Sequence, residues 1–540
     1  MKKPVIALGL DGADPILLEN WMSQGHLKQL IRLRQQGVYF RLSNQENCLE
    51  SSWTTFLTGC LPEQTGCWGA IKFQPNSYET NLVESYNFQE YPPFYALANQ
   101  DRVAISDLSQ AFYPQIKQEP TTLSQTSGYS STTLPLWQLI AQPQQGQAGE
   151  EKSGTWWDKD YLTNLKQVLL TNIKRRVEHC KKLLRQGQWD LLLTLFTETN
   201  SAVRDFWFLS QPDHPLYHHH RLDYGEDPLL EVFEAVDRAI TEILTEVPED
   251  AYILVFAVNG SGRNNTDLAS MLFLPEFLYR FSFPGEAMLP TSKLGTIPLP
   301  PVIAPKKINW SAQIWRQMYH PNPLMRWLRR SGAEKLNQNL EFLLRQPSKL
   351  TGTEPEPLSG LFPPRGTLSW QPSTWYKSFW PDMKAFALPS FSQGQIRINL
   401  QGREKSGIVQ PSEYDSVCEQ LTQQLSSLKN ARTGEFMVEQ VLRIRHSAVA
   451  EESKLPDADL VVIWRDKTAD VMESSDWGRI GPVPYRCTGS YRARGFLLAT
   501  GASIEVGSSR AESHIVNLAP TILKLMGVPI PEYFDGKSLL

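Results

Sequence analysis

Cysteine and long apolar runs are both scarce in this sequence. Only six of the 540 residues are cysteine, too few for a disulfide framework. No apolar stretch reaches the roughly 18 residues that a membrane-spanning helix needs. The first apolar run begins at Pro4 and is broken by Asp11, so it is too short for the apolar region and cleavage site of a secretory signal peptide. We therefore expect a cytoplasmic location.

An excess of charge of one sign is missing too. The 53 Lys and Arg residues are balanced by 57 Asp and Glu residues, and the net charge of −4 argues against a general nucleic-acid-binding protein. What the chain does contain is apolar material, with 41% hydrophobic residues and 16 Trp. This is enough for a large core, built either as one α/β domain with insertions or as two domains.

The first apolar run predicts the element around which the chain is organised. Pro4–Leu10 is followed by Asp11-Gly12-Ala13-Asp14 and then by a helical pattern that includes Ile16 and Trp21. This order is typical of a buried parallel strand that enters a loop and then a helix. Such loops lie at the carboxyl ends of strands, where open α/β sheets bind ligands, so Asp11 is placed like a metal-site or phosphate-site carboxylate. The alternative is that Asp11 and Asp14 only cap the next helix.

The chain resembles a known family in several segments. Asp11-Gly12 and the later Ser52-Trp53-Thr54-Thr55-Phe56-Leu57-Thr58-Gly59 are similar to the alkaline phosphatase superfamily, and most similar to its type I phosphodiesterase/nucleotide pyrophosphatase branch. Further similar segments follow in family order: Trp189–Phe196, Ala251–Asn259, Asn399–Val409, Asp457–Val462, Gly489–Gly495 and Leu518–Gly536.

This resemblance implies the fold and the domain plan. It implies an α/β fold with a large mixed, mostly parallel sheet flanked by helices, interrupted by a helical basic cap insertion. We expect residues 1–273 to form the first part of the core, residues 274–378 the cap, and residues 379–540 the second part of the core.

The resemblance also implies a chemistry, which this sequence does not carry. Enzymes of the family hold two metal ions, usually zinc, with Asp and His ligands, and their Thr or Ser nucleophile lies at a helix amino terminus. Of seven matching positions only Asp11 keeps the needed group. The nucleophile position is Leu49, and the lost ligand positions are Asn200, Arg204, Val258, Asn259 and Tyr491.

These replacements predict a metal-free protein. Asp11 alone does not offset the four positive charges of two zinc ions, and Arg204 adds a further cation, which we expect to pair with Asp11. The sequence therefore favours a catalytically inactive relative without a cofactor that acts in binding or scaffolding. Its partner would be a protein or a phosphate-bearing ligand.

An alternative keeps the activity by shifting the alignment. The nucleophile would then be Ser51, Ser52, Thr54 or Cys48, with Asp205 and His214 among rearranged zinc ligands of a phosphodiesterase or phosphatase. Two smaller motifs have their own alternatives. Cys48, Cys60, Cys67 and Cys487 are either a thiolate zinc site or packed apolar residues, and His218-His219-His220 is either a metal tract or a solvated loop.

One long stretch, Ala287–Ala333, lacks Asp and Glu entirely. We expect two helices there, Ser311–Tyr319 and Pro323–Arg330, separated by prolines. The candidate surface for a partner or an anionic membrane consists of basic and Trp residues: Lys306, Lys307, Trp310, Trp315, Arg316, Arg326, Trp327, Arg329 and Arg330. The alternative is a cap whose aromatic face packs inward while its charges are solvated.

Overall fold

The computed structural model describes residues 2–83, 86–98, 102–106, 158–217, 227–289, 294–298, 300–302, 310–318, 368–446, 454–507 and 510–540. Its contacts divide the chain into two compact units. Unit 1 consists of Met1–Ala70, Val83–Asn264 and Cys487–Leu540. Unit 2 consists of Ile71–Leu82 and Asn265–Arg486.

Unit 1 is built on a seven-stranded sheet with the order β18-β2-β17-β7-β1-β6-β5. The strands are β1 (Val5–Leu10), β2 (Val38–Ser43), β5 (Val103–Ser106), β6 (Leu191–Phe196), β7 (Tyr252–Ala257), β17 (Arg494–Thr500) and β18 (Arg510–His514). Strand β17 runs antiparallel to both of its neighbours, whereas the other four pairings are parallel. The predicted α/β class with a mixed, mostly parallel sheet is confirmed.

Strand β1 lies inside this sheet, between β6 and β7. Val5 is level with Leu191 on one side and with Tyr252 on the other, and all six residues of β1 are buried. A strand covered on both faces needs side chains that are apolar in both directions, which explains its unbroken apolar run. The sequence predicted this strand correctly.

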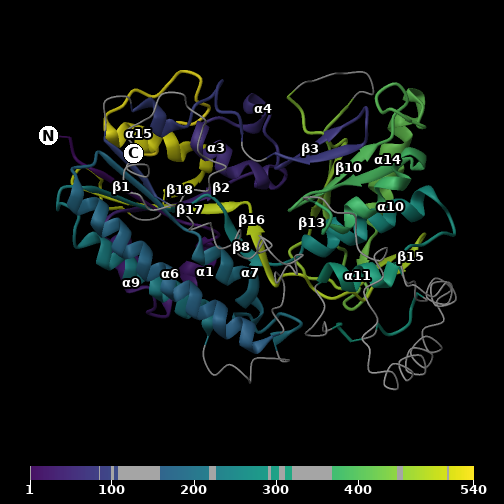
Figure 1. The fold of residues 1–540 in the computed structure, drawn as a ribbon, viewed down its shortest axis with the longest axis horizontal. Coiled ribbons are helices and arrows are strands. Elements are labelled where there is room, and N and C mark those ends of the chain that lie inside the picture. Colours follow the sequence, from purple (N-terminus) through teal and green to yellow (C-terminus); the bar gives the residue numbers. More distant parts are fainter. Residues whose placement is uncertain are drawn as a thin grey trace, which may run out of the picture. The chain divides into compact units, whose positions relative to one another are not determined.

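Helices cover both faces of the sheet (Figure 1). On one face α3 (Ser52–Thr58) and α15 (Leu518–Met526) pack Phe56 and Ile522 into the same core cluster as Val5 and Phe256. The helices of the other face are α1 (Pro15–Ser23), α2 (Lys28–Gln36), α6 (Lys159–Gln186), α7 (Glu198–Ser210) and α9 (Pro228–Leu244). The smaller elements of unit 1 are η1 (Glu46–Ser51), α4 (Pro62–Thr65), η2 (Phe94–Leu97), β8 (Gly260–Arg263), β16 (Gly489–Arg492) and η9 (Ile515–Asn517).

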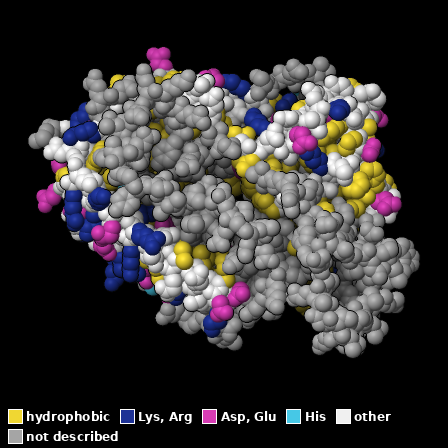
Figure 2. Space-filling model, viewed as in Figure 1, with side chains coloured by type: hydrophobic (Ala, Val, Ile, Leu, Met, Phe, Trp, Pro, Cys, Tyr) yellow, Lys and Arg dark blue, Asp and Glu magenta, His cyan; other side chains and the backbone are white. Residues whose placement is uncertain are grey.

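Both signs of charge are interspersed on the visible side of α6 and α9 (Figure 2). Lys166 of α6 pairs with Glu231 of α9 at 2.7 Å, and Arg185 pairs with Glu246 at 2.5 Å. These helices therefore present paired charges rather than a field of one sign. No helix in the described ranges is both long enough and apolar enough to cross a membrane.

Unit 2 contains smaller, antiparallel sheets. A four-stranded sheet has the order β12-β13-β10-β9, a three-stranded sheet has the order β11-β14-β15, and β3 and β4 form a hairpin. The strands are β3 (Ile71–Gln74), β4 (Glu79–Leu82), β9 (Ala385–Leu388), β10 (Gly394–Ile398), β11 (Lys429–Asn430), β12 (Val438–Arg443), β13 (Leu460–Trp464), β14 (Met472–Ser474) and β15 (Gly478–Ile480). The helices are η5 (Ala269–Phe273), α10 (Leu274–Ser282), α11 (Trp310–Met318), η7 (Pro372–Asp382), η8 (Pro411–Glu413) and α14 (Tyr414–Ser426).

A buried ion-pair network holds unit 2 together at the Asn399–Val409 segment. Arg403 donates to both carboxylate oxygens of Asp459 at 2.7 Å, and its Nε also contacts Glu404. Tyr414 and the Ile398 N–H donate to the same Asp459 carboxylate. Burial alone would raise the pKa of Asp459, but the Arg403 hydrogen bonds hold it below its ordinary value. The segment therefore acts structurally, as a fully hydrogen-bonded core.

Most of the predicted cap, residues 274–378, lies outside the described residues. Its described parts belong to unit 2 together with residues 379–486, which the sequence-based plan placed in the second part of the core. The first expected helix is present as α11, whereas the second, Pro323–Arg330, falls outside the described ranges. The boundaries at 273 and 378 stay predictions.

Candidate functional site at the ends of β1 and β7

The loop after β1 is tied to its neighbours through its backbone. The Asp11 N–H donates to the Phe196 carbonyl at 3.0 Å, and the Thr199 hydroxyl donates to the Asp11 carbonyl at 2.6 Å. The Ser261 hydroxyl donates to the Gly12 carbonyl at 2.5 Å. Gly12 has a φ of 69°, and a Cβ there would lie 2.8 Å from Ser261 Oγ. Only glycine fits such a close, left-handed position.

Asp11 is buried and its partner is Tyr491. The Tyr491 hydroxyl donates to Asp11 Oδ2 at 2.9 Å, from strand β16, which pairs with β8. Asp11 Oδ1 is buried without a hydrogen bond of ordinary geometry among the described residues. Burial raises the pKa of Asp11 to about 7, although hydrogen bonds from Tyr491 and Trp53 lower it in part. Near neutral pH this carboxyl therefore binds and releases a proton when no cation is present.

The next loop residue, Asp14, has a different role. Its side chain accepts from the Ile16 and Leu17 N–H groups and so caps α1, and its Oδ2 lies 2.5 Å from Arg494 Nε. The capping alternative is thus correct for Asp14. Asp11 faces Tyr491 instead.

Arg204 of α7 does not pair with Asp11, which corrects the expectation from the sequence. The structure gives no ion pair between these two described residues, and Arg204 Nη2 instead lies 3.8 Å from Cys487 Sγ. Burial opposes the charged form, yet Cys487 and Asp205 keep the pKa of Arg204 above its ordinary value. Arg204 remains a partly buried cation beside the site, and the carboxyl that it was expected to neutralise is held by a phenol.

The other former ligand positions lie around the same loop. Asn200 contacts Gly12, where an added Cβ would lie 3.4 Å from the Asn200 Cβ. Val258 and Asn259 follow β7, and both are buried. The Asn259 Oδ1 atom has no hydrogen-bond partner within the described part of the chain. Leu49 is buried in η1, just before α3. The structure thus brings Asp11, Asn200 and Tyr491 together, and their chemistry is that of a carboxyl, an amide and a phenol.

The alternative nucleophiles are engaged in local hydrogen bonds. Ser51 donates to the Cys48 carbonyl at 2.9 Å, and Ser52 donates to the Leu49 carbonyl at 2.8 Å. Thr54 Oγ1 lies 3.6 Å from Cys67 Sγ. Burial raises the pKa of the Cys48 thiol to about 12, so the thiolate is disfavoured at neutral pH.

The alternative metal ligands are buried as well. Asp205 and His214 both lie within unit 1, and burial, together with the charge of Arg263, lowers the pKa of His214 to about 3. His214 Nδ1 accepts from the Leu216 N–H at 3.2 Å. Within the described ranges, no three His, Cys, Asp or Glu side chains gather in a way that would hold a metal ion.

The structure describes the cysteines but not the histidine motif. None of the six cysteines forms a disulfide, and burial raises the pKa of Cys60 to about 12, as it does for Cys48. His218-His219-His220 falls outside the described residues.

Two members of the candidate partner surface are in the interior. Trp310 and Trp315 are only 2% and 8% exposed, and the Trp310 indole donates to the Pro484 carbonyl at 2.7 Å. Trp315 packs edge-to-face on Trp375. Neither is a surface anchor, because α11 turns its aromatic side chains into unit 2. The side chain of Arg316 and the whole of Lys306, Lys307, Arg326, Trp327, Arg329 and Arg330 lie outside the described residues.

The residues that support the site were not predicted from the sequence. Thr199 and Ser261 fix the loop backbone, and Trp53 lowers the pKa of Asp11. Thr199 follows the end of β6 and Ser261 follows the end of β7, so hydroxyl residues just beyond parallel strands were an available signal. The pairing of Tyr491 with Ser261 depends on the β8–β16 register, which no local pattern encodes.

Solved structures that resemble the chain have low sequence identity. Alkaline phosphatase PafA is 14% identical, with 100% of this chain and 98% of that chain covered and a TM-score of 0.48. Phosphonoacetate hydrolase from Sinorhizobium meliloti 1021 is 12% identical, with 97% and 96% covered and a TM-score of 0.45. Murine ectonucleotide pyrophosphatase / phosphodiesterase 5 is 10% identical, with 98% and 96% covered and a TM-score of 0.43. Likenesses at this level carry no argument about the site.

Sequence comparison gives the family. No curated protein matches the chain significantly. The family model described as type I phosphodiesterase / nucleotide pyrophosphatase matches residues 5–271, which include β1, Asp11, Arg204 and Asn259. This match confirms the resemblance to the type I phosphodiesterase / nucleotide pyrophosphatase family that the sequence indicated.

Proposed function

We propose that this protein is a catalytically inactive member of its family that acts in binding or scaffolding. The observation that supports the proposal is that a hydrogen-bonding phenol, rather than a metal-binding side chain, lies beside the Asp11 carboxyl. Tyr491 donates to Asp11 at 2.9 Å, and burial raises the pKa of that carboxyl to about 7. Because a carboxylate ligand binds zinc in its ionised form, zinc would have to displace this proton and compete with the Tyr491 hydrogen bond.

The two-zinc site that the resemblance implies does not fit the residues present. Asp11 is the one acidic group among the seven positions, and Arg204 is a partly buried cation. Asn200 and Asn259 offer weak neutral oxygens, and Val258 offers none. Zinc prefers thiolate, imidazole and carboxylate ligands. We therefore assign no cofactor and derive no catalytic step.

The proposed binding role rests on the charged and polar groups that remain near the edge of the sheet. Arg204 keeps a positive charge there, and the Asn259 amide oxygen lacks a hydrogen-bond partner in the described part. A phosphate-bearing ligand would find a cation and polar groups at this edge, whereas a protein partner would use the surface of either unit. We propose that the protein works in the cytoplasm, as its cysteine usage predicts.

The test is a hydrolysis assay on the purified, untagged protein. Bis(p-nitrophenyl) phosphate and p-nitrophenyl phosphate are incubated with the protein and with excess zinc, magnesium or manganese. We expect no turnover above that of Asp11→Ala. Turnover that depends on metal and disappears in Asp11→Ala would establish the alternative, a phosphodiesterase or phosphatase with rearranged ligands.

A further inference from the structure

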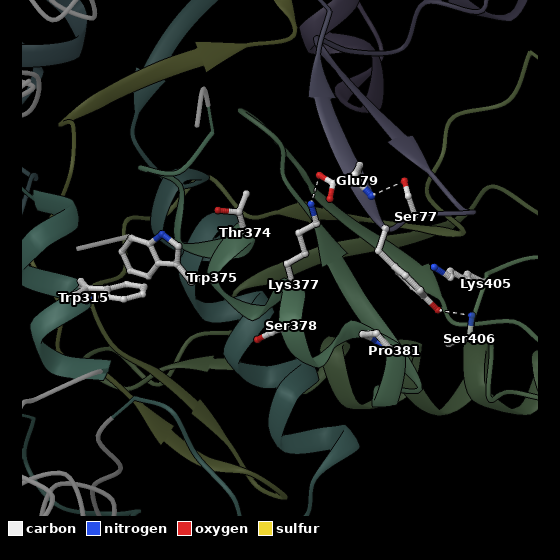
Figure 3. A pocket seen from close by; sticks show the side chains of 11 residues that line it. Ser77, Glu79, Trp315, Thr374, Trp375, Lys377, Ser378, Pro381, Lys405 and Ser406 are labelled. Carbon is white, nitrogen blue, oxygen red and sulfur yellow. Dashed lines mark hydrogen bonds and ion pairs between the residues drawn. The ribbon is translucent and has the colours of Figure 1, made fainter. Parts of the chain in front are cut away.

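Several side chains that line the cavity of unit 2 are already covered or paired (Figure 3). The volume of this cavity is about 650 Å³. Trp315 and Trp375 are only 8% and 5% exposed and pack edge-to-face, so neither ring offers a free face. Lys377 is paired with Glu79. The cavity therefore gives a protein partner no ready apolar surface.

Unit 2 does expose apolar side chains on the segment formed by residues 294–298 and 300–302, here called the 294–302 segment. Ile297 is 93% exposed, more than any other large apolar side chain in the described ranges, and Leu294 is 48% exposed. Pro300 is exposed as well. A single exposed apolar side chain is normal, but several that are left uncovered within one short segment mark a candidate interaction site.

Burial along this segment follows a period of three. Ile297 and Pro300 are exposed, whereas Pro298 and Pro301, each one position further along, are half-buried. The described residues of the segment belong to no helix or strand. Proline fixes its own φ near about −65° and restricts the preceding residue to extended backbone. A polyproline II helix has three residues per turn, so the pattern indicates this conformation, with Ile297 and Pro300 on its outward edge.

A buried arginine anchors the segment beside its most exposed residue. Arg479 of β15 donates to the Thr296 carbonyl at 2.7 Å and to Thr296 Oγ1 at 3.0 Å. The Arg479 Nε also donates to Glu473 of β14 at 2.9 Å, which fixes the guanidinium. The backbone next to Ile297 is thus held in place while the Ile297 side chain stays in solvent. A segment that is ordered before binding loses less conformational entropy when a partner binds it.

We propose that the 294–302 segment binds a partner protein that has a groove lined by aromatic side chains, with Ile297 and Pro300 inserted into the groove. Such grooves recognise segments with two prolines three positions apart in the polyproline II conformation, and Pro298 and Pro301 have this spacing. A membrane anchor combines apolar with basic residues, whereas the described residues of this segment carry no charge. The segment lies in unit 2, and its role does not depend on whether unit 1 is catalytic.

The experiment is isothermal titration of the full-length protein with a panel of purified SH3, WW and EVH1 domains, which are modules that recognise polyproline II ligands. The variants are Ile297→Ser and Pro300→Ala. The matched control is Ile408→Ser, an exposed isoleucine of unit 2 outside the segment. Sedimentation with phosphatidylglycerol–phosphatidylcholine vesicles tests a lipid surface, and analytical ultracentrifugation tests self-association. Circular dichroism confirms that each variant is folded.

The expected result is saturable binding of at least one domain of the panel, with one domain per chain. Loss of a buried aliphatic side chain predicts roughly tenfold weaker binding in Ile297→Ser, with weaker binding also in Pro300→Ala and with Ile408→Ser close to the parent protein. The proposal is overturned if no domain binds at millimolar concentration, or if Ile297→Ser leaves the binding unchanged. Vesicle binding or self-association that Ile297→Ser abolishes, without binding of any domain, would assign the segment to a lipid surface or to a second copy of the chain and also overturn it.

Discussion

The Asp11 carboxyl is the residue on which the proposed loss of metal depends. A metal-bound aspartate is ionised, and its pKa lies below the ordinary range because the cation favours the charged form. Here burial raises the pKa to about 7, and a phenol donates to one oxygen. In the protein without metal, a proton and the Tyr491 hydroxyl are the stabilising partners of this carboxyl.

Asp11→Asn is predicted to stabilise the protein in a pH-dependent way. The folded-state pKa of about 7 lies above the unfolded value of 3.8, so the folded state keeps its proton while the unfolded chain loses it. The contribution of Asp11 to stability is therefore fully present below pH 3.8, falls as pH rises, and levels off above pH 7. The shift corresponds to at most about 4 kcal/mol.

The measurement is urea unfolding at pH 5 and pH 8. We expect the gain in unfolding free energy from Asp11→Asn to be about 2–3 kcal/mol larger at pH 8 than at pH 5. Asp14→Asn is the control, because it weakens the ion pair with Arg494 and should destabilise the protein. A loss of stability in Asp11→Asn at pH 8, together with zinc dependence in the parent, would mean that Asp11 is a ligand.

Tyr491→Phe tests the partner of this carboxyl. The substitution removes the hydroxyl that donates to Asp11 Oδ2 and leaves both carboxyl oxygens without this donor. We predict a loss of about 1–3 kcal/mol in unfolding free energy at pH 8. In Asp11→Asn the same Tyr491→Phe change should cost less, because no charge remains to be solvated. Equal costs in the two backgrounds would show that the hydroxyl does not stabilise the ionised carboxyl.

At the scale of elements, the loop after β1 is shaped by close backbone approach. Gly12 has a φ of 69°, and a Cβ there would lie 2.8 Å from Ser261 Oγ. Gly25 has a φ of 87° but nothing within 4 Å of an added Cβ. Comparing the two alanine variants separates the backbone cost, of about 1–2 kcal/mol, from the packing cost.

We predict that Gly12→Ala destabilises the protein by about 1–3 kcal/mol more than Gly25→Ala does, because only the first must displace a neighbour. Thermal and urea unfolding of the two variants measure the difference. Equal effects would indicate that the Ser261 side chain rotates away freely and does not shape the loop.

In unit 2, the Arg403–Asp459 ion pair is predicted to contribute strongly to stability. Asp459 is fully buried and accepts from Arg403, Tyr414 and the Ile398 N–H. Arg403→Ala leaves a buried carboxylate without its cation and should cost about 3–5 kcal/mol. The exposed pair Arg465–Glu439 is the control, and Arg465→Ala should cost less than about 1 kcal/mol. Comparable losses in urea unfolding would contradict the structural role of the network.

At the scale of the whole molecule, the sequence predicted the regular parts better than the contacts. The strands at Val5 and Leu191 were predictable because a strand buried on both faces is apolar along nearly all of its length. The Asp11–Tyr491 contact was not, because these residues are 480 positions apart and meet through the β8–β16 pairing.

Two predictions about side-chain contacts were wrong for physical reasons. Arg204 was expected at Asp11 on charge alone, but charge does not reveal that Cys487 lies nearer to its guanidinium. Trp310 and Trp315 looked like membrane anchors beside basic residues, yet α11 buries both. Composition predicts which residues are amphipathic, whereas the side to which they turn depends on tertiary packing.

The measurement that tests the central proposal most directly is the zinc content of the untagged protein. The protein is incubated with excess zinc, desalted and analysed by inductively coupled plasma mass spectrometry, with bovine serum albumin treated in parallel for nonspecific retention. We predict zinc far below one ion per chain, and no change in unfolding temperature on adding zinc. One or two retained ions per chain, released by Asp11→Ala, would contradict the account and establish a rearranged metal site.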